Sequence, residues 1–355
     1  MNKTSYSNIP SFIEEKLSRQ LHHQMNHPIE IIKDHIYDYF ARLEDYHFDM
    51  FDNLSQVVSI EDNFDKLLIP LNHVTRSKSD SYYVNDKEVL RTHTSAHQNE
   101  LLSKGYTSFI VVGDVYRKDE CDTKHYAIFH QLEVLTLVAD DKDAIFELKK
   151  LLSGLIEYLF PNCQYRFNND YFPFTDPSYE IEVMYKGNWL EVLGCGIVHP
   201  DILKANNISG QAIAAGFGLD RLVMIFCDIP DIRYLWSTHE RFLNQFADGK
   251  LNQFVPYSTL PDQIRDISFY VLNMNNQKWL DENDFYELIR NYEDVKEVKL
   301  IDTFYNKKIE QHSRTYRLTY SPNRPDKNPA EFTKYVNDIQ DQLRINVQQL
   351  NITLR

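Results

Sequence analysis

The sequence predicts an α+β fold, and three patterns support this class. A strand–loop–strand hairpin is predicted over residues 109–138, where two apolar runs flank the polar segment 118–124. Two further strands, at 180–183 and 189–196, are separated by a Lys-Gly turn and are expected to pair antiparallel. The C-terminal part predicts the order β-α-β-β-α-β, which is typical of a ferredoxin-like domain.

Two helices and a short strand are expected before the hairpin. Ser11–Arg19 predicts a short amphipathic helix, and a longer helix begins at Pro28, because proline is favoured in the first helical turn. Apolar residues recur at helical spacing from Ile29 to Phe40, and we expect this stripe to pack in the core, with a dimer interface as the alternative. A turn at 61–64 leads into a short strand at 67–70.

The elements after the hairpin follow from the same periodicities. A helix is expected at 141–160 and a strand at 163–167, and a strand or turn containing Gly216 and Gly218 precedes a helix that begins at Leu219. The ferredoxin-like pattern consists of strands at 266–272, 298–304, 315–320 and 352–354 and of helices at 284–291 and 329–350.

Length and composition limit the class of protein. A chain of 355 residues suggests two domains, and a hydrophobic content of 43% is enough for a sizeable core. The four cysteines include no CxxC pair, which argues against a zinc site or a disulfide framework and is typical of a reducing compartment: Cys121, Cys163, Cys195 and Cys227. No apolar run approaches the roughly 20 residues that a membrane span requires. Residues 1–26 lack the apolar stretch of a signal peptide and the Arg-rich, acid-poor character of a transit peptide.

The net charge of −14 argues, as a total, against a nucleic-acid-binding protein. Its distribution changes this expectation, because residues 249–355 contain 15 Lys and Arg against 15 Asp and Glu. The whole negative excess therefore lies in residues 1–248, and a polyanion would meet less repulsion from the C-terminal part.

The predicted hairpin concentrates polar side chains that suit a phosphate and an ammonium group. Arg117 presents a planar fork to a phosphate, and Asp119 is expected on the same strand face two residues later. Gln131 and Glu133 have the same i, i+2 relation on the return strand and offer two acceptors to an ammonium group. The inner faces are expected to carry these four residues together with His125 and His130. The alternative is an exposed hairpin with surface ion pairs.

Residues 92–98, THTSAHQ, lie where a predicted strand ends and a helix begins. Hydroxyl, imidazole and amide groups at such a helix N-terminus favour an anion. For this segment alone, N-capping by Thr94 or Ser95 is the simpler interpretation, with His97 as a surface histidine.

Residues 171–177 combine aromatic side chains with prolines. Phe172 and Phe174 share one face of an extended segment that the prolines hold open, so two parallel rings would offer walls to a third ring. Core packing is the alternative. Gly194 and Gly196, further along, allow a ligand or another backbone to approach closely.

Two charged residues occur in apolar surroundings. Glu191 interrupts an apolar strand, where a carboxylate is costly unless it is paired or binds a metal ion. Arg221 lies one turn into an apolar helix, where a buried arginine indicates either a bound anion or a local ion pair with a neighbouring aspartate.

Five motifs together resemble the phenylalanyl-tRNA synthetases, specifically the single-chain type known from mitochondria. They are THTSAHQ (92–98), VVGDVYRKD…HYAIFHQLE (111–133), YFPFTDPSYEIEV (171–183), WLEVLGCG (189–196) and FGLDRLVM…DIPDIR (217–233). Each motif is modest evidence by itself, but five in this order and spacing are highly specific. The similarity extends from about Asn26 to the C-terminus.

The resemblance implies a class II synthetase catalytic domain, which is an antiparallel sheet flanked by helices, followed by a ferredoxin-like anticodon-binding domain. The implied limits are 1–25 for an N-terminal extension, 26–246 for the catalytic domain, 247–257 for a linker and 258–355 for the anticodon-binding domain. The implied enzyme activates phenylalanine with ATP and Mg²⁺ and transfers the phenylalanyl group to tRNA(Phe). Such a transfer needs no side-chain nucleophile.

The resemblance also implies the residues of the site. For phenylalanine they are His93, Ser95, Ala96, His97, Gln98, Gln131, Leu132, Glu133, Phe172, Phe174, Ala214 and Gly216. For ATP they are Arg117, Asp119, Lys124, His125, Tyr126, Glu191, Ala215 and Arg221. Three of these are the expected catalytic residues: Arg117 on the α-phosphate, Arg221 on the terminal phosphate, and Glu191 on ATP or its magnesium ion. Gln131 and Glu133 are expected to hold the ammonium group of the substrate.

The sequence departs from the family at a few positions. Ala215 replaces an aromatic residue near the ligand, Asp220 replaces a glutamate, and the segment 204–214 matches poorly. A synthetase-like paralogue that binds nucleotide or RNA without charging tRNA is therefore the alternative function. A ligase that makes another acyl-adenylate is disfavoured by Phe172, by Phe174 and by the C-terminal domain.

The implied partners are phenylalanine, ATP and tRNA(Phe), with no membrane, and the resemblance implies a monomer. Contacts with the anticodon stem are expected from aromatic stacking and from basic residues, with a solvated charged face as the alternative: Lys307, Lys308, Arg314 and Arg317. The resemblance places the protein in the mitochondrial matrix, and the cytoplasm is the alternative because no transit segment is visible.

Overall fold

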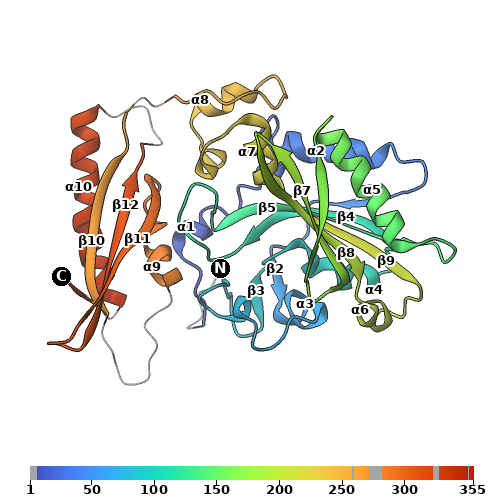
Figure 1. Cartoon of the computed structure of the whole chain (residues 1–355), viewed down its shortest axis with the longest axis horizontal. Helices are drawn as coiled ribbons and strands as arrows, with labels where there is room; N and C mark the ends of the chain where they lie inside the picture. Colours follow the sequence, from blue (N-terminus) through green and yellow to red (C-terminus); the bar gives the residue numbers. More distant parts are fainter. Residues whose placement is uncertain (1–5, 258–259, 272–281, 323–327, 351) are drawn as a thin grey trace. The chain divides into compact units, whose positions relative to one another are not determined.

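A computed structural model describes residues 6–257, 260–271, 282–322, 328–350 and 352–355, and it divides into two compact units (Figure 1). The first unit consists of Met1–Arg117, Ile128–Cys227 and Phe246–Leu251. The second consists of Lys118–Ala127, Asp228–Gln245 and Asn252–Arg355. The tip of the predicted hairpin therefore belongs to a different unit from the two strands that it joins.

The first unit is built on a seven-stranded sheet with the order β1-β4-β5-β9-β8-β7-β6. The pair β1 and β4 is parallel, and the other pairs are antiparallel. The strands are β1 (Asp49–Phe51), β4 (Ser108–Tyr116), β5 (Ile128–Val138), β6 (Tyr165–Asp170), β7 (Thr175–Tyr185), β8 (Asn188–Val198) and β9 (Gln211–Gly218). Both predicted antiparallel pairs, β4 with β5 and β7 with β8, are confirmed.

Three helices cover this sheet where the apolar periodicity predicts them. α5 (Ala144–Leu159) packs against β8 and β9, α7 (Leu219–Cys227) packs against β5, and α2 (Pro28–Ala41) packs against both of these helices. The side chain of His27 caps α2 and that of Asp143 caps α5, because each accepts a hydrogen bond from a backbone N–H of the first turn.

A core of apolar side chains lies on the face of the sheet to which Glu133 points. Leu135 of β5 and Ala214 of β9 pack there with side chains from smaller elements. These elements are α4 (Gln98–Ser103), α6 (Pro200–Ala205) and the two-stranded sheet of β2 (Val57–Ser59) and β3 (Glu88–Leu90). Because alternate residues of a strand point to opposite faces, Leu135 and Glu133 share this face.

The N-terminal region differs from the sequence prediction in three places. The helix predicted over Ser11–Arg19 is limited to α1 (Ser11–Glu14), and the 3₁₀ turn η1 (Leu21–His23) follows. The strand predicted at 67–70 is wrong, because Leu68 has a positive φ of 59° that a strand does not allow. The turn predicted at 61–64 is largely the short helix α3 (Ile60–Asn63), capped by the Ser59 side chain.

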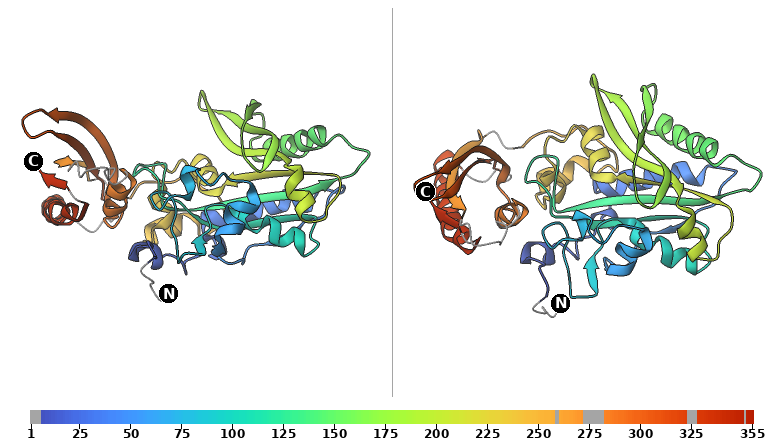
Figure 2. Two further views of the ribbon diagram at one scale, coloured as in Figure 1. Left: turned by 90° about the horizontal axis from the view of Figure 1, so that it is seen from below. Right: turned by 60° about the horizontal axis from the view of Figure 1, so that its bottom comes forward.

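The C-terminal part of the second unit confirms the ferredoxin-like prediction. Its antiparallel sheet has the order β11-β12-β10-β13. The elements in chain order are β10 (Gln263–Val271), α9 (Glu282–Ile289), β11 (Val295–Asn306), β12 (Gln311–Tyr320), α10 (Pro329–Asn346) and β13 (Ile352–Leu354). Figure 2 shows the long, curved β11–β12 hairpin, which contains two register shifts. Leu272, the last residue of the strand predicted first in this domain, lies outside the described residues.

Candidate active site

The candidate site is organised around Glu133 on β5. Its side chain is buried, with 4% of the residue exposed, and its Oε2 accepts a hydrogen bond from Ser95 Oγ. Burial raises the pKa of Glu133 to about 7, although the hydrogen bond from Ser95 opposes this shift. Among the described residues no cation is recorded as its ion-pair partner, so the carboxylate is suited to receive one from a ligand.

Two glycines lie between Glu133 and the aromatic segment, and neighbouring side chains cover them. A methyl group at Gly216 would lie 2.9 Å from Nε2 of Gln131, so the Gln131 amide covers this glycine. Across the sheet, Glu133 is opposite Gly216 of β9, and Gly216 is opposite Gly194 of β8. A methyl group at Gly194 would lie 2.8 Å from Cζ of Phe172, so the ring of Phe172 covers this glycine. Neighbouring strands are about 4.8 Å apart, so the backbones of Glu133 and Gly194 are about 10 Å apart.

Phe172 and Phe174 form two nearly parallel walls. Their ring centroids are 5.8 Å apart with an interplanar angle of 17°. The extended conformation predicted for this segment is wrong, because Pro173 and Phe174 form a turn in which the N–H of Thr175 donates to the carbonyl oxygen of Phe172 at 3.2 Å. Phe174 also packs against the core that contains Ala214, and the ring of His93 lies 6.2 Å from it. This arrangement suits an additional aromatic ring.

Several buried polar atoms of the predicted site have no hydrogen-bond partner among the described residues. They are both ring nitrogens of His93, Oγ1 of Thr94, Nε2 of Gln98 and Oε1 of Gln131. Such atoms are rare in folded proteins unless a water molecule or a ligand meets them. Burial, aided by the charge of Arg117, lowers the pKa of His93 to about 3, so this imidazole is neutral at physiological pH.

The phosphate-binding candidate Arg117 directly follows β4 and is exposed. Its Nε donates to the carbonyl oxygen of Thr92 at 2.8 Å, which fixes the guanidinium at the end of the strand. The guanidinium carbon lies 5.2 Å from the centroid of Phe129. Phe129 was missed by the sequence prediction, although its i, i+2 spacing before Gln131 and Glu133 places it on the same face of β5.

Arg221 and Glu191 are more exposed than predicted. Their side chains are 50% and 51% exposed, and Arg221 Nη1 lies 3.9 Å from Glu191 Oε2. The prediction that both side chains lie in apolar surroundings is therefore wrong, because each projects from the solvent-exposed side of its helix or strand. Partial burial raises the pKa of Glu191, and the charge of Arg221 opposes this shift.

Four of the predicted ATP-binding residues lie in the second unit: Asp119, Lys124, His125 and Tyr126. β4 ends at Tyr116, so the prediction that Arg117 and Asp119 share a strand face is wrong. His125 pairs with Asp122, and the ring of Tyr126 contacts that of Trp236. In the same loop, the carbonyl oxygen of Cys121 accepts a hydrogen bond from the backbone N–H of Val298 at 2.9 Å.

Four further residues of the predicted site are buried in the protein: Ala96, His97, Leu132 and Ala215. His97 is buried rather than superficial, and its ring contacts Arg91 and Glu100. Ala96 is part of the core, and Leu132 points away from Glu133 because it is the adjacent residue of the strand. Ala215 also lies on the far face, directly opposite Val134, so an aromatic ring at this position would enter the opposite side of the sheet.

His130 also lies on this far face, where it contacts Asp114, rather than among the substrate-facing residues of the hairpin. Among the described residues, two groups of potential metal-binding side chains bring their ligand atoms within 4.8 Å of one another, and Glu191 belongs to neither. The groups are His22, Asp114 and His130, and Glu120, Asp122 and His125. Within the described part of the chain, every helix falls short of the length and apolar character that crossing a membrane requires.

Comparisons with known proteins agree with this geometry. Residues 13–246 match the model of the tRNA synthetases class II core domain (F). The chloroplastic/mitochondrial phenylalanine–tRNA ligase of Arabidopsis thaliana is 44% identical, over 98% of this chain and 83% of that protein. The mitochondrial enzyme of Mus musculus is 39% identical, over 89% and 79%, and that of Saccharomyces cerevisiae is 32% identical, over 94% and 89%. This chain therefore belongs to the phenylalanine–tRNA ligase family of class II aminoacyl-tRNA synthetases.

Proposed function

We propose that this chain activates phenylalanine with ATP and transfers the phenylalanyl group to tRNA(Phe). The observation that carries the proposal is the row Glu133–Gly216–Gly194, where the glycines leave room for the Gln131 amide beside the carboxylate and for the ring of Phe172 at the far end. A free α-amino acid with an aromatic side chain matches this row, because its ammonium group pairs with the carboxylate and its ring packs edge-to-face against the aromatic walls.

The amino-acid site consists of a polar end and an apolar end. Glu133 and Gln131 hold the ammonium group, with Ser95 and His93 as further polar neighbours, and the buried amide of Gln98 lies in the same region. Phe172 and Phe174 select an unsubstituted ring, with Ala214 and Gly216 as the small residues of the floor. An apolar pocket of this type rejects an added hydroxyl by only about a hundredfold.

The nucleotide site begins where the amino-acid site ends. Arg117 binds the α-phosphate and Arg221 the terminal phosphate, since a planar guanidinium gives paired hydrogen bonds to phosphate oxygens. Phe129, beside Arg117, offers a π face on which a base can stack. Further ATP-binding residues are proposed in the loop 118–127, which belongs to the second unit: Asp119, Lys124, His125 and Tyr126.

Glu191 is the residue proposed to hold Mg²⁺. Its half-exposed carboxylate lies near Asp170, Glu180 and Glu182, whose charges raise its pKa. Oxygen ligands supplied by one or two carboxylates fit a magnesium ion that is otherwise bound by water and phosphates. The ion would supply positive charge at the reacting phosphate, while Arg117 and Glu133 orient the two substrates in line.

The ferredoxin-like domain is proposed to bind the anticodon stem of the tRNA. The limits proposed for the parts of the chain are 26–246 for the catalytic domain, 247–257 for the linker and 258–355 for the anticodon-binding domain, after an N-terminal extension. A monomeric enzyme in the mitochondrial matrix is the finer proposal. It is supported by the similarity to single-chain relatives whose names place them in mitochondria or chloroplasts.

The test is amino-acid-dependent exchange of pyrophosphate into ATP, followed by charging of tRNA(Phe). Exchange with phenylalanine about a hundredfold better than with tyrosine is expected from the apolar walls. Absence of exchange with phenylalanine would refute the proposed activation. Exchange without charging of tRNA(Phe) would instead favour a paralogue that has lost transfer.

A further inference from the structure

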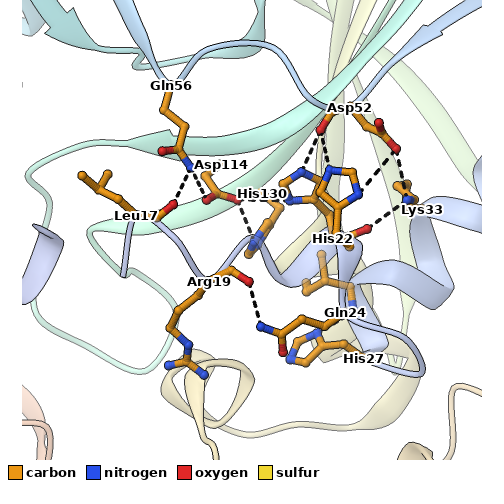
Figure 3. A network of polar contacts seen from close by, with 12 residues as sticks. Leu17, Arg19, His22, Gln24, His27, Lys33, Asp52, Gln56, Asp114 and His130 are labelled. Carbon is orange, nitrogen blue, oxygen red and sulfur yellow. Dashed lines mark hydrogen bonds and ion pairs between the residues drawn. The ribbon is translucent and has the colours of Figure 1, made fainter. Parts of the chain in front are cut away.

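A chain of polar side chains crosses the core on the far side of the sheet from Glu133. The imidazole of His130 lies between two carboxylates, with Nε2 3.1 Å from Asp114 Oδ1 and Nδ1 3.1 Å from Asp220 Oδ2. Asp114 Oδ1 is also 3.2 Å from His22 Nδ1, and His22 Nε2 is 3.0 Å from the carbonyl oxygen of Asp52. Figure 3 shows this sequence of contacts from Asp52 to His130.

The chain is ionic at its centre and almost completely buried. The side chains of Asp114 and His130 have no exposed surface. Burial alone would disfavour the imidazolium form, but the two carboxylates outweigh it and raise the pKa of His130 to about 10. Burial likewise opposes the charge of Asp114, yet the contacts with His130 and His22 lower the pKa of this carboxyl. His130 is therefore a cation whose Nδ1 is hydrogen-bonded to Asp220, whereas its Nε2 forms an ion pair with Asp114 without hydrogen-bond geometry.

Additional hydrogen bonds fix the orientation of the carboxylates. The amide of Gln56 donates to Asp114 Oδ2 at 2.9 Å, and the hydroxyl of Tyr116 lies 3.4 Å from the same oxygen. Asp220 Oδ2 accepts a second hydrogen bond, from the backbone N–H of His130 at 2.5 Å. Because Asp220 holds both the ring and the backbone of His130, α7 is tied directly to β5.

Each charged member of the chain is close in sequence to a residue of the proposed site. Asp114 lies on β4, which ends just before Arg117. His130 is followed by Gln131 on β5, and Asp220 is followed by Arg221 in α7. The network thus joins the three elements that carry the phosphate-binding and ammonium-binding groups.

We propose that His130 is a positioning residue, whose ion pairs with Asp114 and Asp220 set the spacing between Arg117, Gln131 and Arg221. This inference rests on the proposed function of the site. A stabilising role alone is a poor explanation, because replacing a buried ion pair with apolar residues is often neutral or stabilising. The network instead holds β4, β5 and α7 in one relative arrangement, and in-line attack on the α-phosphate is sensitive to such an arrangement.

The main test is Asp220→Asn, which keeps the shape of the side chain and removes its charge. Glu147→Gln is the matched control. Glu147, on α5, is also a buried carboxylate, it accepts a hydrogen bond from the hydroxyl of Tyr46, and it does not belong to the network of His130. The measurements are Tm and the kcat and KM for phenylalanine-dependent exchange. For Asp220→Asn, a fall in kcat of about a hundredfold is expected with little change in KM, because misalignment by about 1 Å has this effect. The control should keep the wild-type kcat.

A kcat for Asp220→Asn within twofold of wild type, in a folded protein, would overturn the inference. So would equal losses of kcat in Asp220→Asn and Glu147→Gln. If Asp220→Asn does not fold, His22→Gln tests the other end of the chain, where a smaller fall in kcat is expected and an unchanged kcat counts against the role. One tightly bound Zn²⁺ per purified chain would also overturn it, because the histidines would then be neutral ligands. If the wild-type protein shows no exchange, the proposed function itself is refuted. If the wild-type protein is active and the variants are unaffected, only the positioning role of His130 is refuted.

Discussion

The hydroxyl of Ser95 donates a hydrogen bond to the carboxylate of Glu133, although the two residues are 38 positions apart in the sequence. The contact connects the turn η4 (Thr94–His97) to the middle of β5. It leaves the other carboxylate oxygen without a recorded hydrogen bond among the described residues. Glu133 is thus held in place by a neutral partner and keeps its capacity to bind a cation.

The affinity for phenylalanine should depend on pH through Glu133. The pKa of this carboxyl is raised to about 7, so the empty pocket takes up a proton below that pH and loses its attraction for an ammonium group. KM for phenylalanine should therefore rise by about tenfold per pH unit below 7 and level off above it. His93, with a pKa of about 3, stays neutral in this range. Exchange assays between pH 5.5 and 8.5 measure the effect, and a flat KM would contradict it.

Glu133→Gln should stabilise the fold while removing activity. The folded pKa is raised from 4.5 to about 7, so the stability present below pH 4.5 is lost as the pH rises through 7. The ionised group then costs about 3 kcal/mol at pH 8. Denaturant unfolding should show the variant to be more stable by up to this amount at pH 8 and nearly equal at pH 4. Exchange should be lost, and a destabilised variant at pH 8 would contradict the prediction.

Gly194→Ala should weaken phenylalanine binding by moving an aromatic wall. The added methyl group would lie 2.8 Å from Cζ of Phe172, so the ring must shift into the proposed pocket. Overpacking of this kind costs about 1–3 kcal/mol, which predicts a KM for phenylalanine raised by about tenfold or more. Gly218→Ala is the control, because the nearest atom to its methyl group is Arg221 Cβ at 4.0 Å. Equal KM values for the two variants would count against the pocket.

Arg221→Lys should reduce the use of ATP more than that of phenylalanine. Lysine keeps the charge but loses the planar pair of donors, and kcat/KM for ATP should fall by about tenfold or more. Arg166→Lys is a matched control, since Arg166 is also partly exposed and pairs with Glu182 on a neighbouring strand. The comparison of the two variants uses exchange at varied ATP. A loss confined to KM for phenylalanine would show that Arg221 does not face the phosphates.

Lys307→Glu and Lys308→Glu together should impair charging but not exchange. Both lysines are exposed in the turn between β11 and β12, next to the exposed side chains of Phe304 and Tyr305. Lys334→Glu, on the exposed face of α10, is the single-site control. Each removed phosphate contact should also lower the dependence of tRNA affinity on salt. Normal charging by the double variant would place the tRNA elsewhere on the domain. Deletion of 249–355 is a poorer test, because it also removes the backbone hydrogen bond from Val298 to Cys121 and so disturbs the loop 118–127.

Sequence periodicity predicted those features of the fold and the site that depend on a single helix or strand. The two-residue period of a strand is enough to place Gln131 and Glu133 together. The parallel rings of Phe172 and Phe174 were predicted from the same period, but they lie at a turn before β7. The apolar runs likewise predicted the hairpin strands and the ferredoxin-like order. These features follow from local sequence because the direction of a side chain is set by the backbone of its own strand.

The exposure of a charged residue could not be predicted in the same way. Arg221 and Glu191 have apolar neighbours, but their own sides of helix and strand remain open to solvent. Periodicity shows which residues share a face and not whether another element covers that face. The partners of His130 were missed for a related reason, since Asp114, Asp220 and His22 meet only after three distant segments pack together.

The loop 118–127 has an unusual position in the architecture, because it belongs to the unit that contains the ferredoxin-like domain, whereas the strands on either side belong to the catalytic sheet. The loop is therefore the segment through which the proposed binding of tRNA and the proposed binding of ATP could be thermodynamically coupled. If tRNA binding stabilises one conformation of the second unit, it also acts on the loop residues that are proposed to bind ATP. Linkage then requires reciprocity: the factor by which tRNA changes ATP affinity equals the factor by which ATP changes tRNA affinity.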